Sequence, residues 1–231
     1  MRSDPWSAED VLRWAFATFN REVAIASAFG LEGMVLIDIA SRISPQFRVF
    51  TIDTGFLFPE TYDLMARVEK HYRIKLERVY SVLSPEEQQN LYGSRLWARD
   101  PNLCCTIRKV EPLKSKLTEL RAWITGIRCD QTAVRAAANK VEWDSNFERV
   151  KINPLVDWTP EKVWDYICQY HVPYNPLHDR GYPSIGCTHC TRAVKPGEDP
   201  RAGRWSDFQK TECGLHVPSH NSLARHLHKA I

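Results

Sequence analysis

The sequence predicts an α/β protein, with a doubly wound, mostly parallel sheet and helices on both faces, formed by a single domain of residues 1–231. Two observations lead to this fold class. Short apolar runs rich in β-branched residues alternate with segments whose apolar residues recur at helical spacing. Three of these runs also end near a glycine with polar neighbours. The alternation favours parallel strands joined by right-handed helical crossovers.

The first half of the chain follows this alternation element by element. Residues 10–20 place four apolar side chains on one helical face, and residues 22–29 follow as a β-favouring run. Residues 30–43 are apolar nearly all round, which is typical of a helix packed between a sheet and other elements. Residues 47–53 predict a second strand, and residues 59–72 predict an amphipathic helix after it.

The second half continues the pattern and then loses it. Residues 74–80 and 122–127 predict two further strands. Helices are expected over residues 100–117, which start with Asp-Pro-Asn, and over residues 157–170. Beyond about residue 173, proline, glycine, histidine and charged residues replace the periodic pattern. This composition predicts a tail that folds against the body or moves over it.

The composition narrows the class of protein. With 43% hydrophobic and 26% charged residues, the chain resembles an ordinary globular protein, and no apolar run approaches the ~20 residues that span a bilayer. The net charge of +3 is too small to indicate a nucleic-acid partner. The N-terminus lacks the pattern of a secretory signal, so we expect a cytoplasmic protein. In that reducing compartment, seven cysteines indicate metal binding or thiol chemistry more often than disulfides.

Two of the strand ends carry candidate nucleotide-binding residues. Ser27 and Gly30 lie where the first strand turns into a helix, and free backbone N–H groups at such a turn can bind an anion. The turn lacks both common phosphate-loop patterns, so a simple connection is the better-supported alternative. Asp53 and Thr54 end the second strand, where the carboxylate could meet a ribose or adenine edge. An aspartate that bonds only its own turn is about equally supported.

The third strand end adds positive charge. Gly126 closes a predicted strand and is followed by Arg128 and Arg135, whose side chains can bind anions and sugar hydroxyls. Charges at such a position are often only solvated. Because the carboxyl ends of parallel strands meet at one edge, the three strand ends together predict a single ligand crevice.

Four cysteines form two closely spaced pairs. Cys187 and Cys190 have the Cys-x-x-Cys spacing of many metal sites, and Cys104 and Cys105 are adjacent in a predicted helix. Adjacent helical residues point about 100° apart, which suits a bulky cluster better than one tetrahedral ion. Local geometry still leaves zinc and a [4Fe-4S] cluster as comparable alternatives. A disulfide between adjacent cysteines is strained and not expected in the cytosol.

One further cysteine is a candidate nucleophile. Cys213 lies in a polar, glycine-containing segment, and a nucleophilic thiol needs access and nearby positive charge. Arg201, Arg204 and His216 could supply that charge. The alternative is an unremarkable surface cysteine. Packing roles are expected for the two remaining cysteines, and solvated positions for three histidines near the C-terminus: Cys129, Cys168, His220, His226 and His228.

Eight segments in this order resemble the assimilatory sulfonucleotide reductase family, and more narrowly its bacterial adenylylsulfate (APS) reductases with a [4Fe-4S] cluster. The resemblance covers roughly residues 20 to 217. Family members without the paired cysteines usually reduce the 3′-phosphorylated substrate, PAPS, so the two pairs here favour APS. The segments are SAFGLEG (27–33), TIDTGFLFPETY (51–62), DPNLCCTIRKVEPL (100–113), WITGIRCDQTAVRA (123–136), INPLVDWT (152–159), GCTHCTR (186–192), GRW (203–205) and ECGLH (212–216).

The resemblance implies a fold like that of the adenine nucleotide alpha hydrolases and a role for each site residue. A C-terminal segment, about residues 205–231, would move over the active site and carry Cys213 as the nucleophile. Lys109 would lie close to the cluster, and three other side chains would meet the sulfate or phosphate of the substrate: Arg201, Arg204 and His216. The implied cluster ligands are Cys104, Cys105, Cys187 and Cys190.

The implied reaction converts APS to sulfite and AMP through a thiosulfonate on Cys213. A reduced thioredoxin or a glutaredoxin-like donor would then release sulfite. Two alternatives stay open: a PAPS reductase, which differs by a pocket for the 3′-phosphate, and a zinc-stapled module that binds a nucleotide or RNA. The sequence leaves the oligomeric state open, a homo-oligomer included.

Overall fold

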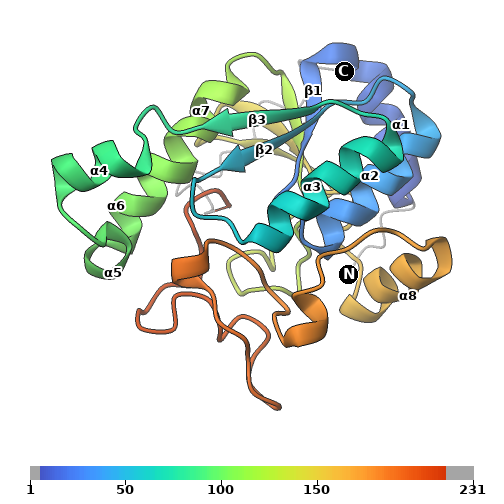
Figure 1. Cartoon of the computed structure of the whole chain (residues 1–231). Coiled ribbons are helices and arrows are strands. Elements are labelled where there is room, and N and C mark those ends of the chain that lie inside the picture. The colour runs from blue at the N-terminus through green and yellow to red at the C-terminus, as the bar shows by residue number, and fades with distance from the viewer. Residues whose placement is uncertain (1–5, 217–231) are drawn as a thin grey trace.

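A mixed sheet organises the part of the chain that the computed structural model describes, residues 6–216 (Figure 1). Its six strands lie in the order β3-β2-β1-β4-β6-β5, and every neighbouring pair is parallel except β5 and β6. The chain reverses its direction of travel across the sheet between β1 and β4. A ligand crevice is expected at the carboxyl ends of those two strands. The strands are β1 (Val23–Ala26), β2 (Val49–Asp53), β3 (Leu76–Tyr80), β4 (Ala122–Ile124), β5 (Val141–Asp144) and β6 (Arg149–Ile152).

Helices cover the two faces of the sheet unequally. The main core packs four helices against one face: α1 (Ala8–Phe19), α2 (Leu31–Ile43), α3 (Pro59–Tyr72) and α8 (Pro160–Tyr170). The other face is covered by α7 (Glu111–Leu117), whose Leu113 and Leu117 pack on Phe50 and Trp123 of the strands. The predicted α/β class with helices on both faces is therefore confirmed. Burial of α2 on nearly all sides agrees with its uniformly apolar sequence.

The predicted helix over residues 100–117 is interrupted. It comprises α6 (Pro101–Cys105), a π-helical turn (Thr106–Val110) and α7. Asp100 begins α6 by accepting hydrogen bonds from the backbone N–H groups of Asn102 and Leu103, at 3.1 and 2.9 Å. π-Helical turns inside helices frequently mark functional sites.

The sequence prediction lacked several elements. The β5–β6 hairpin forms one edge of the sheet, and the short helices α4 (Pro85–Tyr92) and α5 (Leu96–Arg99) lie between β3 and α6 (Figure 1). After α8 the chain is mostly irregular up to residue 216, with short helical turns at His178–Arg180 and Thr188–Cys190. None of the described helices combines the length and apolar character needed to cross a membrane.

Candidate active site

The turn after β1 brings the backbone close to the N-terminus of α2. Ser27 Oγ accepts a hydrogen bond from the Phe29 N–H at 3.1 Å, and a Cβ atom at Gly33 would lie only 2.5 Å from that oxygen. Gly30 is the N-cap of α2, and no side chain caps this helix. The N-terminus of α2 therefore presents its backbone N–H groups at the carboxyl edge of the sheet, as the sequence predicts.

The polar side chains at the end of β2 form hydrogen bonds within the chain. The buried carboxylate of Asp53 accepts hydrogen bonds from the Gly55 N–H at 3.0 Å and from the Tyr62 hydroxyl at 2.8 Å. Thr54 Oγ1 accepts from the Phe56 N–H at 3.2 Å and lies 3.4 Å from Cys187 Sγ. Asp53 thus bonds its own turn, the alternative that the sequence left open. Thr54 links the strand end to the cysteines, and nucleotide contacts of either residue stay a prediction.

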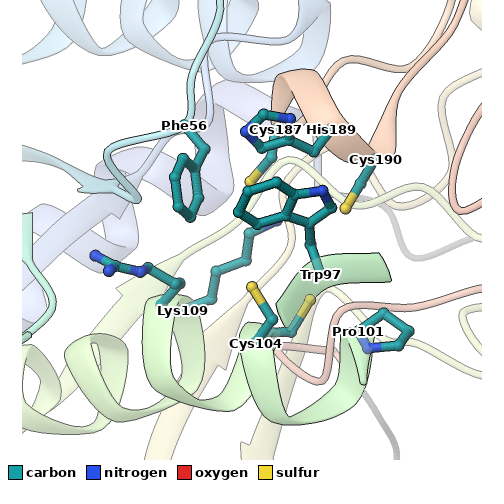
Figure 2. Close-up of a pocket in the computed structure, with 10 residues that line it drawn as sticks. Phe56, Trp97, Pro101, Cys104, Lys109, Cys187, His189 and Cys190 are labelled. Atoms are coloured by element: carbon teal, nitrogen blue, oxygen red, sulfur yellow. The ribbon is translucent and has the colours of Figure 1, made fainter. Parts of the chain in front are cut away.

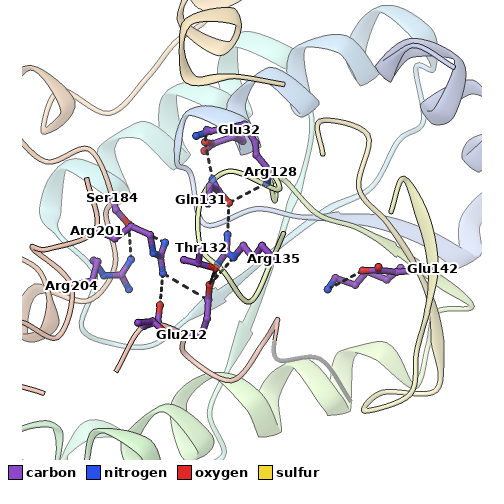
Figure 3. Close-up of polar contacts among 12 residues, drawn as sticks. Glu32, Arg128, Gln131, Thr132, Arg135, Glu142, Ser184, Arg201, Arg204 and Glu212 are labelled. Atoms are coloured by element: carbon purple, nitrogen blue, oxygen red, sulfur yellow. Dashed lines mark hydrogen bonds and ion pairs between the residues drawn. The ribbon is translucent and has the colours of Figure 1, made fainter. Parts of the chain in front are cut away.

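The end of β4 packs tightly against α2. A Cβ atom at Gly126 would lie 2.9 Å from Glu32 Cβ and 3.2 Å from the Gly33 nitrogen, so glycine permits this approach. Arg128 is buried and forms ion pairs with Glu32 and with Asp130, the latter at 2.9 Å (Figure 3). Its charge is therefore balanced within the chain, and its contact with a nucleotide stays a prediction.

The two cysteine pairs meet in one cavity, here called the thiol pocket (Figure 2). Cys104 and Cys105 reach it from α6, Cys190 reaches it from the turn Thr188–Cys190, and Cys187 reaches it from the N-cap position of that turn. A backbone hydrogen bond of 2.8 Å from the Thr188 N–H to the Phe56 carbonyl ties that turn to the end of β2. The lining residues are Phe56, Trp97, Pro101, Cys104, Cys105, Arg108, Lys109, Cys187, His189 and Cys190.

Aromatic rings form part of the pocket wall. The rings of Trp97 and His189 stack with centroids 3.9 Å apart and planes 8° apart, and Phe56 meets both edge-on. Arg108 lies over the Phe56 ring at 5.2 Å. Its Nε donates to Gln88 Oε1 at 2.7 Å, and its Nη1 donates to the Leu83 carbonyl at 2.8 Å. The sequence carried no signal for this wall, because its members come from four separate segments.

Burial controls the charge of the thiols. Desolvation and the neighbouring thiols raise the pKa of Cys104 to about 11, and desolvation with Cys187 raises that of Cys190 to about 11. Desolvation also raises the pKa of Cys105, although Lys109 opposes it. Burial therefore favours the protonated forms of Cys104, Cys105 and Cys190. Within residues 6–216, no group of three or more His, Cys, Asp or Glu side chains is arranged so that it could hold a metal ion.

Lys109 connects the pocket to Cys213. It follows Cys105 by four residues, across the π-helical turn, and so lines the same cavity. Desolvation alone would lower the pKa of Lys109, but the negative charge of Cys187, Cys213 and Cys105 in their ionised forms raises it above its usual value. Lys109 is thus a cation at neutral pH, between the pocket and the predicted nucleophile. All seven cysteines are free thiols.

Arg201 and Arg204, which lie just before Trp205, converge on Ser184. Its hydroxyl accepts from Arg204 Nη1 at 3.1 Å and from Arg201 Nη1 at 3.5 Å (Figure 3). Arg201 Nη2 also donates to the Thr211 carbonyl at 2.8 Å, two residues before Cys213. Both Nε groups are buried and find no hydrogen-bond partner among the described residues. Two N–H donors therefore stay available beside the segment that carries Cys213.

His216 lies against the sheet, its Nδ1 is buried without a hydrogen-bond partner among residues 6–216, and its contact with the substrate stays a prediction. Its ring stacks on Trp123, with centroids 5.7 Å apart and planes 7° apart. Desolvation first, then the charges of Arg135, Lys151 and Arg201, lower the pKa of His216 well below its usual value. A neutral imidazole adds no positive charge at Cys213, so that charge comes from Arg201 and Lys109.

One ion pair at this site was missed by the sequence analysis. Arg135 pairs with Glu212 through two hydrogen bonds of 2.7 and 2.8 Å, and the Thr132 hydroxyl donates to the same carboxylate at 3.0 Å (Figure 3). The available signal was the position of Glu212 directly before Cys213. The three histidines beyond it, His220, His226 and His228, lie outside the described residues.

A mostly parallel sheet with a switch point beside β1 and a four-thiol pocket define an α/β protein of the class that binds ligands at the carboxyl ends of its strands. The chain belongs to the family described as the phosphoadenosine phosphosulfate reductase domain, whose model matches residues 22–193. This match confirms the resemblance found in the sequence.

Comparison with individual proteins agrees with this membership. Adenosine 5′-phosphosulfate reductase from Halalkalibacterium halodurans is 50% identical over 208 residues, which cover 90% of each chain. The crystal structure of a phosphoadenylyl-sulfate (PAPS) reductase from Candida auris, a phosphate complex, is 36% identical with a TM-score of 0.72, covering 82% of this chain and 91% of that one. Yeast FAD synthetase shares the fold alone, at 18% identity and a TM-score of 0.56 over 80% of this chain and 66% of its own.

Proposed function

We propose that the protein is an APS reductase, which converts adenosine 5′-phosphosulfate to sulfite and AMP in sulfate assimilation. The single observation that carries this proposal is the thiol pocket, lined by both cysteine pairs and by Lys109, which interacts electrostatically with Cys213. The 50% identical relative that bears the name adenosine 5′-phosphosulfate reductase supports the same substrate.

Sulfur transfer to the protein is the first chemical step. The Cys213 thiolate attacks the sulfur of APS, a sulfur–sulfur bond forms, and the bond between that sulfur and the bridging oxygen breaks. AMP leaves with the bond's electron pair, and Cys213 becomes a thiosulfonate. Lys109, Arg201 and Arg204 neutralise the sulfonate and phosphate oxygens, so that an anionic thiolate can approach. Ser27, Gly30, Asp53, Thr54, Gly126 and Arg128 form the nucleotide edge of the site.

Release of sulfite needs an external dithiol. A thiolate of reduced thioredoxin, or of a glutaredoxin-like donor, attacks Cys213 Sγ, and sulfite leaves with the electron pair of the broken sulfur–sulfur bond. The donor's second thiol then breaks the mixed disulfide and restores the Cys213 thiolate. The donor becomes a disulfide, so its two electrons account for the reduction of sulfur from +6 to +4. The clustered cysteines of the sequence support function in a reducing cytoplasm.

The thiol pocket fits a [4Fe-4S] cluster by the chemistry of its donors. Four cysteine sulfurs from two segments surround one cavity, and four thiolates are the usual ligand set of such a cluster. The ligands would be Cys104, Cys105, Cys187 and Cys190. Four thiolates are also a ligand set for one zinc ion, so the identity of the metal is left to the elemental analysis below. A bound cluster would supply a fixed local charge that orients Lys109.

Substitution of Cys213 tests the reaction directly. Cys213→Ser should abolish sulfite formation and leave iron content and visible absorbance unchanged, because Cys213 is outside the proposed ligand set. With APS and no reductant, mass spectrometry of the wild type should show the added sulfonate on residue 213. Cys168→Ser is the matched control, since Cys168 is an exposed thiol on α8, and it should retain full activity. Turnover by Cys213→Ser would refute the assigned nucleophile.

Two further measurements separate the alternatives. A PAPS reductase is the second candidate, because the Candida auris PAPS reductase shares 36% of its sequence with this chain; competing APS against PAPS in one assay decides between them. Metal analysis after anaerobic purification should give about four iron atoms per chain for a [4Fe-4S] cluster. About one zinc ion per chain would instead support the zinc-stapled binding module.

A further inference from the structure

The loop that carries Cys213 is held from both sides. Before the cysteine, Glu212 binds Arg135 and Thr132. After it, Gly214 adopts a φ of +91°, and a Cβ atom there would lie 3.1 Å from Val110 of the π-helical turn. Leu215 then packs on the core beneath α7. These contacts define the position of Cys213 opposite Lys109.

The hydrogen bonds between Glu212 and Arg135 are buried and charge-assisted. The side chain of Glu212 is 4% exposed and that of Arg135 is 10% exposed, and the two carboxylate oxygens meet two guanidinium nitrogens at 2.7 and 2.8 Å. Arg201 adds a second positive charge at 3.7 Å. Bidentate pairs of this kind fix geometry as well as adding binding energy. Arg201 Nη2 adds one hydrogen bond of 2.8 Å to the Thr211 carbonyl, but the pair with Arg135 is the bidentate contact of this loop.

This pair also belongs to a network that reaches the nucleotide edge. Arg135 Nη1 donates to Gln131 Oε1, and Gln131 Nε2 donates to Glu32 Oε1 at 3.0 Å (Figure 3). Glu32 lies in the first turn of α2, whose N-terminus faces the predicted crevice. A continuous set of polar contacts thus joins the start of α2 to the residue before Cys213.

We propose that the Arg135–Glu212 pair is a latch that holds residues 211–214 closed and so positions Cys213 against Lys109 and the thiol pocket. Glu212 is in this sense a positioning residue, which acts through the loop and does not touch the reacting atoms. Opening the loop for an external dithiol requires this buried pair to separate. The latch therefore favours the closed state, in which Cys213 faces the substrate.

Thiol labelling measures the latch without any substrate. In Glu212→Gln the charge is lost at constant size, so the rate at which iodoacetamide alkylates Cys213 in the holoenzyme should rise about 10- to 100-fold, the range that one charged hydrogen-bonded contact supports. Glu212→Asp keeps the charge and should restore most of the slow labelling. Peptide mass spectrometry reports residue 213 separately from exposed Cys168. An unchanged rate in Glu212→Gln would overturn the latch.

Control variants separate the latch from general loss of stability. Glu77→Gln removes an ion pair with Arg48 at the far side of the sheet, and labelling of Cys213 should stay at the wild-type rate. If Glu212→Gln unfolds, buried Cys104 and Cys105 will label as fast as Cys213. In that case Thr132→Val, which removes one hydrogen bond to Glu212, decides: faster labelling of Cys213 alone supports the latch, and an unchanged rate refutes it.

The kinetic consequence rests on the proposed function, whereas the labelling does not. Glu212→Gln should lower the single-turnover rate of thiosulfonate formation on residue 213 with little change in the APS concentration that gives half the maximal rate. Failure of the wild type to form that adduct would count against the proposed reaction and leave the labelling result intact. Faster labelling with an unchanged adduct rate would refute the positioning role.

Discussion

Arg204 offers a sharp test of the substrate site, because one methyl group at Gly186 displaces its guanidinium. A Cβ atom at Gly186 would lie 2.3 Å from Arg204 Nη2 and 2.6 Å from its Cζ, whereas ordinary contacts begin at 3.4 Å. The guanidinium must therefore move by about 1 Å. It would leave the Ser184 hydroxyl and the Ile185 carbonyl, to which Nη1 donates at 3.1 and 3.3 Å. The ring of Trp205, 4.5 Å from Cζ, limits where it can move.

Gly186→Ala should therefore change activity far more than stability. The displaced atoms are the end of a flexible side chain, and the backbone of Gly186 is outside the left-handed region, so folding is barely affected. A misplacement of about 1 Å in a site that neutralises developing charge costs on the order of 100-fold in rate. We expect kcat/KM for APS reduction to fall by about 10- to 100-fold, which is the loss of one hydrogen-bonded charge. The thermal unfolding midpoint should stay near that of the wild type.

A double-mutant cycle tests this reasoning. Steady-state sulfite formation is measured for Gly186→Ala, Arg204→Ala and the double variant. If the methyl group acts through Arg204, then adding Gly186→Ala to Arg204→Ala should cost almost nothing further. A full additional loss in the Arg204→Ala background would show that Gly186 acts by another route and would refute the argument.

Two predictions concern stability. In Gly203→Ala the new Cβ atom would lie 2.2 Å from the Arg192 carbonyl oxygen. The Arg192 N–H also donates to the Gly203 carbonyl at 2.9 Å, so the strain falls on two paired backbone segments. The free energy of unfolding, measured by urea titration, should drop by about 1–3 kcal/mol. The pKa of Glu77 is lowered to about 2 by hydrogen bonds from Arg48 first and then Lys116, against desolvation. Folded Glu77 thus loses its charge at lower pH than unfolded Glu77, so its contribution is complete above about pH 4.5 and declines as pH falls toward 2. Urea titrations at pH 7 and pH 3.5 should show a smaller acid loss for Glu77→Gln than for the wild type, and equal losses would contradict this.

Much of the fold could be predicted because its signals are local. The strands of the parallel core and the helices around them follow the periodicity of neighbouring residues. The β5–β6 hairpin was missed because its strands are short and carry buried charged side chains, such as Asp144 and Lys151, in place of a clear apolar alternation. Helix α4 did have a sequence signal for its start: Ser84 and Glu87 form a capping box, and Pro85 lies in the first turn.

The site was predictable only where residue types and spacing carry information. The cysteine spacing predicted that two pairs would serve one site, and the structure brings all four to one cavity. By contrast, Arg135 and Glu212 are 77 residues apart, and no local pattern tells which carboxylate an arginine will meet. The sequence therefore counted Arg128 and Arg135 as anion-binding residues, although folding pairs each of them with a carboxylate of the same chain.

This internal pairing determines which cations can receive a substrate anion. Arg128 is neutralised by Glu32 and Asp130, and Arg135 is neutralised by Glu212. A further anion therefore gains little electrostatic energy from either arginine. Arg204 forms no ion pair among residues 6–216, and Arg201 meets Glu212 only at 3.7 Å. Each of the two arginines also keeps a buried Nε group without a hydrogen-bond partner in that part of the chain, and both lie within the segment that leads to Cys213. A buried N–H without an acceptor is unfavourable, so an incoming sulfonate or phosphate oxygen relieves it. For the proposed reaction we therefore expect the anionic end of the substrate to lie near Cys213 and the nucleoside to lie at the strand ends.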